Sequence, residues 1–393
     1  MEQVRLFALG GLDESGKNMY VIEVNDDIFI IEVGLKYPSE HEQLGVEMII
    51  PDFTYLIENK DRIKGIFITH GHDDVLGAIG HLIKSVNIPI YATPFTSLLI
   101  KKELQKLKIK NAKIHKIKRN DRFKVSNTLI QTFGVTQSVP DGVGIVIKTP
   151  KGSIVYTSEY LMDYDIRNPH FSCDIGRFAE IGKDGVLALL SESVGANNTG
   201  YTAPRHRISD IIEPYFESAQ GRLLITVYKQ NLFRIIEILE LAKKYKKRVF
   251  FYDESQLELL AMLQTLGYYD IDKDLLISKK EFNKDSMDTI CIVSGSGARV
   301  FKRMNRIATK EDELVELKEN DTVVVASPVV AGTEKEASNM ENDLYKEGVN
   351  VVTINAKQVY SMHASIEDLK MMIYLFKPKY YIPVKGEYRH LIA

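Results

Sequence analysis

The spacing of the expected strands changes near residue 200, and this change constrains the fold more than any other feature. Up to about residue 160, short β-branched and aromatic runs bounded by Gly, Pro, Asn or Asp follow one another closely, with helical stretches only after Asp74 and at about 95–108. From about Arg205, helical patterns of roughly 10 to 15 residues alternate with single buried strands, which is typical of a parallel sheet. We therefore predict an α/β protein with a sheet-rich first domain, helices packed outside it, and a parallel-sheet second domain.

The individual elements follow from the same patterns. Strands are expected at 4–10, 18–24, 27–34, 63–69, 88–92, 113–117, 129–135, 143–148 and 153–157, and then at 223–228, 248–252, 289–293, 322–326 and 349–354. The helices of the second part include 231–245, 255–266 and 333–347. A helix at 365–376, a strand at 380–384 and a turn at 386–389 follow.

Composition excludes several classes of protein. The 393 residues carry 51 basic and 53 acidic side chains, for a net charge of −2, and 45% are hydrophobic, as in ordinary globular domains. Cys173 and Cys291 are far apart and outside any Cys-x-x-Cys pattern, so neither a disulfide framework nor a cysteine-built zinc site is expected. No run approaches about 18 apolar residues and no secretory segment stands at the start, so we expect no membrane span and a cytoplasmic location.

A His-x-His pair followed by a carboxylate is the sharpest chemical signal. His70, His72 and Asp74 stand at i, i+2 and i+4, directly after the apolar run 63–69. In a loop that leaves a strand, two imidazoles and a carboxylate at this spacing can converge on a metal ion. A solvated loop without ligands is the alternative that these residues alone leave open.

A basic segment is the second signal. Residues 101–119 hold eight lysines and Arg119 against the single acidic Glu103. Such a segment can follow a phosphate backbone. A solvated helix face and an edge strand protected from pairing are the alternative explanation.

The histidine loop also resembles the His-x-His-x-Asp-His loop of the metallo-β-lactamase superfamily, and other segments resemble its β-CASP branch and, within it, the ribonuclease J family. The segments that carry the resemblance are 8–19 (ALGGLDESGKNM), 49–52 (IIPD), 138–141 (SVPD), 294–296 (SGS), 327–329 (SPV) and 377–389 (KPKYYIPVKGEYR). The resemblance implies an αββα metallo-β-lactamase sandwich over 1–200, an inserted parallel-sheet β-CASP domain over 201–355, and a return to the sandwich over 356–393. Members of the family continue further, so the end of the sandwich and a C-terminal domain are expected to be missing here.

Several positions depart from the family pattern. The pattern expects histidines at Val75, Gln137 and Lys385, and aspartates at Glu159 and Glu32. Valine offers no lone pair, and a charged lysine beside a dication lowers the affinity for that ion. We therefore expect the second of two metal sites to be empty. The first site is expected to bind one ion weakly, zinc by family with manganese or magnesium as alternatives, through His70, His72, Asp74 and Glu159.

The resemblance also assigns substrate-binding residues. The expected phosphate-binding residues are Ser294, Gly295, Ser296, Tyr360, Ser361, Met362 and His363, and residual catalytic roles fall to Asp74, Glu192 and His363. The pattern is eroded here, because Gly297, Arg299 and Met362 replace its glutamine, glutamate and glycine. Simple strand-to-helix turns are the alternative.

These features favour a degenerate ribonuclease J subunit of the second type found in many Gram-positive bacteria. Such a subunit would act in RNA processing and decay, including rRNA maturation and mRNA turnover, with weak or absent 5′-to-3′ exonuclease and endonuclease activity. Its expected partners are RNA, an active paralogue in a hetero-oligomer or a second copy in a homodimer, and other RNA decay proteins. An active exoribonuclease with a reduced metal site is the main alternative, and a small-molecule hydrolase or a structural protein on the same fold is the third.

Overall fold

The computed structural model describes residues 3–38, 45–282, 288–330 and 332–393. They form two compact units, which we call unit 1 (Met1–Ala203 with Met362–Ala393) and unit 2 (Pro204–Ser361). The family-domain limits expected from the sequence, at 200 and 355, remain a prediction.

Unit 1 contains two six-stranded sheets. The first has the order β1 (Val4–Gly10), β2 (Met19–Val24), β3 (Asp27–Ile31), β4 (Ile63–Ile68), β5 (Ile90–Ala92) and β6 (Ile114–Lys116). The second has the order β17 (Tyr380–Val384), β11 (Val186–Glu192), β10 (Gly152–Tyr156), β9 (Val143–Thr149), β8 (Thr128–Gly134) and β7 (Arg122–Val125). Strand β17 pairs in parallel with β11, and this pairing joins the last part of the chain to the sheet of its first half.

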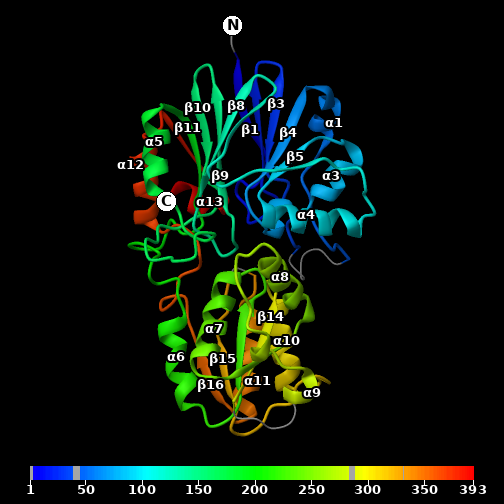
Figure 1. The fold of residues 1–393 in the computed structure, drawn as a ribbon, viewed down its shortest axis with the longest axis vertical. Coiled ribbons are helices and arrows are strands. Elements are labelled where there is room, and N and C mark those ends of the chain that lie inside the picture. The colour runs from blue at the N-terminus through cyan, green and yellow to red at the C-terminus, as the bar shows by residue number, and fades with distance from the viewer. Residues whose placement is uncertain (1–2, 39–44, 283–287, 331) are drawn as a thin grey trace. The chain divides into compact units, whose positions relative to one another are not determined.

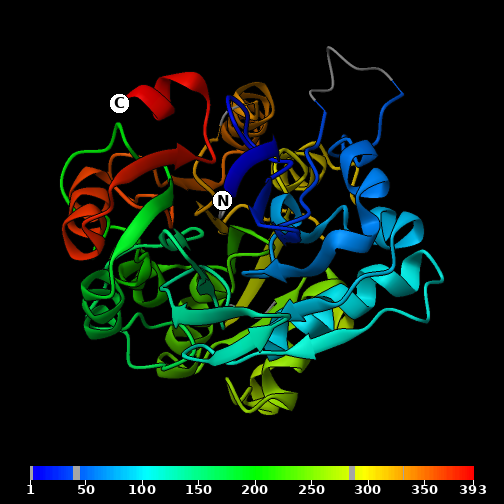
Figure 2. The same cartoon turned by 90° about the horizontal axis from the view of Figure 1, so that it is seen from above.

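Side-chain alternation along the strands explains the layers of unit 1. In β3, Ile28 and Ile30 pack against helices, whereas Phe29 and Ile31 pack against the second sheet. The outer helices are α1 (Thr54–Glu58), α3 (Ile79–Ser85) and α4 (Pro94–Lys106) over the first sheet, and α5 (Ile175–Lys183) and α12 (Ile366–Phe376) over the second. Figures 1 and 2 show the two helix groups on opposite sides of the paired sheets. The predicted αββα sandwich is confirmed.

Unit 2 is built on one parallel five-stranded sheet. Its order is β13 (Arg248–Phe251), β14 (Thr289–Gly295), β12 (Leu223–Tyr228), β15 (Thr322–Val325) and β16 (Asn350–Thr353). The helices are α6 (Ser209–Ser218), α7 (Leu232–Lys244), α8 (Glu254–Thr265), α9 (Lys279–Phe282), α10 (Arg299–Ala308) and α11 (Glu334–Lys346). The central strands β12, β14 and β15 are buried on both faces, as parallel strands between helices require, so the predicted parallel sheet is confirmed.

The helix predicted after Asp74 is found, but it is divided into two. The structure has a short helix α2 (Asp73–Leu76) and then α3, separated at Gly77 and Ala78. The break has a local cause, because the segment bonds sideways to the chain that follows β3. Val33 N–H donates to the Val75 carbonyl over 2.8 Å, and Ala78 N–H donates to the Val33 carbonyl over 3.0 Å.

Other differences concern elements with weak sequence signals. The turn predicted at 386–389 gives way to a short helix, α13 (Tyr388–Ile392), and β7, β11 and α5 were not predicted. Strand β7 has only four residues, of which Arg122 and Lys124 are exposed, so it has too few apolar residues for their alternation to predict a strand. Among the described helices, none is long and apolar enough to cross a membrane.

Candidate metal centre

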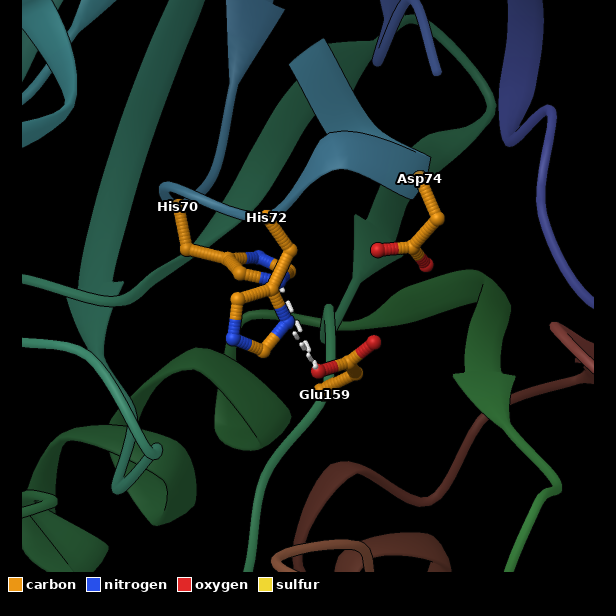
Figure 3. Close-up of side chains that lie close together, drawn as sticks. All are labelled: His70, His72, Asp74 and Glu159. Atoms are coloured by element: carbon orange, nitrogen blue, oxygen red, sulfur yellow. Dashed lines mark ion pairs between the residues drawn. The ribbon is translucent and has the colours of Figure 1, made fainter. Parts of the chain in front are cut away.

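The His-x-His loop lies at the carboxyl end of the buried strand β4. His70 is fully buried, and His72 is the N-cap residue of α2, so that Asp74 projects from the first turn of that helix. Glu159 follows β10 of the other sheet. Figure 3 shows the rings of His70 and His72 and the carboxylate of Glu159 pointing toward one another, with Asp74 beside them. The sandwich therefore brings together the four residues that the sequence proposed as a metal site.

The donor atoms of this cluster lie close enough to share one cation. One ligand atom from each of His70, His72, Asp74 and Glu159 lies within 4.8 Å of the others. Glu159 Oε2 is 3.5 Å from His70 Nε2 and 3.1 Å from His72 Nδ1. Two ring nitrogens and a carboxylate oxygen facing one point are the donor set that zinc and similar divalent ions take.

Hydroxyl groups orient both imidazoles from behind. His70 Nδ1 lies 2.9 Å from Thr69 Oγ1 and 3.0 Å from Ser158 Oγ, and His72 Nε2 lies 2.8 Å from Ser138 Oγ. Burial lowers the pKa of His70 to about 4, so its ring is neutral near pH 7. Its Nε2 has no hydrogen-bond partner among the described residues, and it faces the cluster. A buried, neutral and unpartnered nitrogen fits a metal ligand held by outer hydrogen bonds.

Lys385 occupies the other side of the cluster. Its ammonium lies 3.0 Å from Asp74 Oδ2 and also donates a short hydrogen bond to Glu159 Oε1. Burial opposes this charge, but Asp74 and Glu159 outweigh that effect and raise the pKa of Lys385 above its ordinary value. The same ammonium and the two imidazoles outweigh burial at Glu159 and hold its pKa well below the usual range. Lys385 is therefore a fixed positive charge between two carboxylates that would otherwise be free to bind a second cation.

Backbone strain gathers around this cluster. Glu32, Ser158 and Lys385 adopt positive φ angles of 63°, 65° and 55°, in the left-handed region that residues with a Cβ rarely populate. Each such residue costs on the order of 1 kcal/mol, which the surrounding structure must offset. Strain of this kind concentrates at functional sites, where it fixes the direction of a side chain.

A second polar pair borders the same cavity. Glu192 Oε2 lies 2.6 Å from His363 Nδ1, and Glu192 Oε1 accepts hydrogen bonds from the backbone N–H groups of Tyr160 and Ala364. Although burial disfavours its charge, Glu192 raises the pKa of His363 to about 9, so His363 is a cation at neutral pH. The cavity has a volume of about 230 Å³ and is lined by Ser15, Gly16, His72, Asp74, Glu159, Val194, His363 and Lys385.

Two positions that would be histidines in the family pattern take other roles. Val75 is fully buried in the apolar core under the first sheet and does not line the cavity. Gln137 is also buried, and its Nε2 donates to Glu159 Oε2 over 3.3 Å while its Oε1 has no partner among the described residues. Neither side chain extends the set of nitrogen donors.

The expected phosphate-binding residues fall in both units. In unit 2, Ser294 and Gly295 end β14 and Ser296 begins the turn to α10, as the strand-end prediction requires. Tyr360 also lies in unit 2, where its hydroxyl accepts a hydrogen bond from Arg205 over 2.8 Å. Ser361 is the last residue of unit 2, whereas Met362 and His363 belong to unit 1. Their role in binding phosphate remains a prediction.

Several residues that support the cluster were not predicted to do so. Thr69, Ser138 and Ser158 orient the imidazoles, and Asn18 Nδ2 donates to Asp74 Oδ2 over 2.8 Å. Thr69 and Ser158 are direct neighbours of His70 and Glu159 in the chain, so small hydroxyl residues beside a candidate ligand were the available signal. Asn18 gave no such signal, because only the fold brings it to Asp74.

Comparison with known proteins agrees with this architecture. Residues 50–170 match a family described as beta-lactamase superfamily domain, residues 220–344 match ribonuclease J, beta-CASP domain, and residues 348–393 match Zn-dependent metallo-hydrolase RNA specificity domain. Ribonuclease J 2 of Staphylococcus aureus strain NCTC 8325 is 36% identical over 394 residues, covering 100% of this chain and 70% of that protein. The chain belongs to the ribonuclease J family. The family resemblance read from the sequence is thereby confirmed.

Other matches extend the comparison. Ribonuclease J 2 of Staphylococcus epidermidis strain ATCC 35984 is 35% identical, again covering 100% of this chain and 70% of that protein. A crystal structure of a protein of unknown function from Enterococcus faecalis V583 superposes with a TM-score of 0.67 over 98% of this chain and 94% of the other, at 14% identity. At that identity the structural match supports the fold alone. Membership in a metallo-hydrolase family and the cluster around His70 together indicate metal use, without fixing which metal.

Glu32 makes folding stability depend on pH. Its buried carboxylate accepts hydrogen bonds from Thr69 N–H over 3.2 Å and from the Thr69 hydroxyl, yet burial raises its pKa from 4.5 to about 8. Because the folded pKa is the higher one, the contribution of this group to stability is lost as pH rises from about 4.5 to about 8. We expect Glu32→Gln to increase the free energy of unfolding at pH 8, by on the order of 2 kcal/mol, and to give a smaller gain or none at pH 5.

The measurement is urea unfolding at both pH values with a chelator present. Glu58→Gln, at an exposed position, is the matched control and should change stability little at either pH. An equal effect of Glu32→Gln at pH 5 and pH 8 would show that Glu32 is not the titrating group.

Proposed function

We propose that this chain is a type-two ribonuclease J subunit, acting in the cytoplasm in RNA processing and decay. Its own nuclease activity is weak or absent, and it serves mainly as the partner of an active paralogue. The observation that carries the proposal is the position of Lys385, whose ammonium binds both Asp74 and Glu159.

The charges around Lys385 argue against a second metal ion. Asp74 and Glu159 are the carboxylates that a second ion would need, and both already form ion pairs with the ammonium of Lys385. A dication placed beside an ammonium meets strong repulsion at the low effective dielectric of a buried site. Val75 and Gln137 supply no replacement nitrogen, so the residues present do not fit a second ion.

The residues do fit one ion. His70 Nε2, His72 Nδ1 and Glu159 would hold it, with zinc proposed by family and manganese or magnesium as alternatives. Such an ion would supply Lewis acidity to a phosphodiester. Two-ion sites stabilise both the attacking and the leaving oxygen of a phosphodiester, and here Lys385 offers only a single charge at the second position. Slow hydrolysis follows from this arrangement.

Binding of a phosphate is better supported than its hydrolysis. His363 carries a positive charge at neutral pH through Glu192, and it borders the cavity together with Lys385. A cationic imidazole at the edge of a cavity can pair with an RNA phosphate independently of turnover. We propose that Asp74, Glu192 and His363 keep residual roles here, and that Ser294–Ser296 and Tyr360–His363 bind phosphate as in the family pattern.

An active 5′-to-3′ exoribonuclease with a reduced metal site is the second candidate. The intact donor set of His70, His72 and Glu159, with a free and neutral nitrogen on His70, is the observation that favours it. Hydrolysis of 5′-monophosphorylated RNA separates the two proposals.

We expect the protein to hydrolyse 5′-monophosphorylated RNA, with zinc or manganese added, no faster than the variant His70→Ala/His72→Ala. We expect Gln137→His/Lys385→His to be faster than either by about 100-fold, because it adds two nitrogen donors beside Glu159 and removes the ammonium. Single-turnover assays with labelled RNA measure both rates. Metal-dependent hydrolysis that His70→Ala/His72→Ala abolishes would instead favour the active exoribonuclease.

The partner role is tested by association. We expect the chain to co-purify with an active ribonuclease J paralogue of the same cell at a fixed ratio, and the complex to survive gel filtration. The variant His70→Ala/His72→Ala is the control, since loss of metal ligands should leave the association unchanged. Absence of a stable complex would remove the partner role while leaving the hydrolysis result intact.

A further inference from the structure

Residues 108–124, which overlap the basic segment 101–119 noted in the sequence, include the edge strands of both sheets. Strand β6 is the last strand of the first sheet and β7 is the last strand of the second, and only about five residues join them. Residues 108–124 hold eight basic side chains against the single Asp121, in a chain whose net charge is −2. This edge of unit 1 is therefore strongly positive.

Most of these cations have no carboxylate partner in the part of the chain that the structure describes. Arg119 is used internally, because its guanidinium donates to backbone carbonyls that include Val135. The carboxylate oxygens of Asp121 accept hydrogen bonds from the backbone N–H groups of Lys118 and Arg122. We call the exposed cations on and beside β6 and β7 the basic strip, which consists of Lys113, Lys116, Lys118, Arg122 and Lys124.

An aromatic stack ends at the same edge. Phe67, Tyr91 and His115 are cross-strand partners on β4, β5 and β6, and their rings lie parallel at successive centroid distances of 5.0 Å and 5.0 Å. His115 is exposed, and among the residues that the structure describes no further strand pairs with the outer side of β6. Tyr91 covers one face of the His115 ring, so the opposite face is turned toward the open edge, where a flat ring from a ligand can extend the stack.

Protection of sheet edges explains only part of this arrangement. Lysines on edge strands discourage pairing with other chains. However, Lys113 and Lys118 lie outside the strands, and an exposed ring at the end of a stack does nothing to prevent edge pairing. Unpaired cations beside a stacking surface are the combination that single-stranded nucleic acid requires.

We propose that the basic strip and His115 bind single-stranded RNA, with the phosphates on the cations and a base stacked on the imidazole. The residues of this site lie on and beside β6 and β7, whereas the residues of the His70 cluster follow β4 and β10 of the same unit. It rests on the proposed function insofar as the ligand is RNA. The basic strip would bind an RNA substrate, or an RNA that is also bound by the partner, even if this subunit hydrolyses no RNA itself.

The test measures the affinity for a 5′-labelled 20-nucleotide oligouridine by fluorescence anisotropy. The buffer contains a chelator, and the measurement is repeated at several salt concentrations. We expect Lys116→Glu/Arg122→Glu/Lys124→Glu to weaken binding about tenfold or more at 0.1 M salt, and to reduce the slope of log K against log salt by about 2, at roughly 0.7 per lost contact. The matched control is Lys60→Glu/Lys151→Glu/Lys183→Glu, the same charge change at exposed lysines of the same unit, which should weaken binding less than about threefold.

The stack is tested separately. His115→Ala should weaken binding about tenfold, whereas His115→Phe keeps a flat ring and should bind as the unchanged protein does. Circular dichroism and the melting temperature verify that each variant is folded. Wild-type affinity and salt slope in the strip variant, or an equal loss in the control variant, would overturn the strip while RNA binding itself stands. If the unchanged protein binds no RNA, the proposed function fails together with the strip.

Discussion

A buried ammonium group between two carboxylates is the interaction on which the centre of unit 1 depends. Lys385 is 4% exposed at its side chain and contacts Asp74 and Glu159, which follow strands of two different sheets. Removing such a charge from water is costly, and only the paired carboxylates offset that cost. Without Lys385, both acids would face the same cavity with no cation between them. Lys385 thus stabilises the two carboxylates of a cavity that is expected to bind metal in this family.

Long-range pairing puts the lysine there. Strand β17 joins the second sheet beside β11, and Lys385 follows directly with a φ of 55° while its N–H donates to the Gly11 carbonyl over 3.0 Å. Asp74 is fixed in turn by Asn18, from the first sheet. The opening segment, the histidine loop and the last strand of the chain therefore meet at one ammonium group. A side chain held this firmly is difficult to displace by a soluble cation, and this is the physical basis of the weak hydrolysis that we propose.

Local patterns in the sequence predicted the sheet-rich first domain, the parallel sheet and most of the cluster, and the family resemblance implied the αββα sandwich. The apolar run before His70 and the change of rhythm near residue 200 correctly indicated the strand end and the parallel sheet. The spacing of His70, His72 and Asp74 brought three of the four clustered residues together in advance, and Glu159 came from the family resemblance.

What the sequence did not reveal depends on tertiary contacts. The break between α2 and α3 follows from backbone hydrogen bonds to Val33, and the hydrophobic periodicity of the segment does not predict it. The pairing of Lys385 with Asp74 joins residues more than 300 positions apart, and the ring stack ending at His115 spans three strands. The charge pattern alone indicated the basic segment. Only the sheet order shows that its last cations continue along the open edges of two sheets.

Metal stoichiometry tests the central claim most directly. The protein would be purified without a histidine tag from medium supplemented with zinc and manganese, and its metal content measured by elemental mass spectrometry against the protein concentration. If Lys385 takes the place of the second cation, the content will not exceed one ion per chain, and weak binding at the first site will bring it below that. Close to two ions per chain would contradict the claim, because two dications and the ammonium of Lys385 cannot share the carboxylates of Asp74 and Glu159.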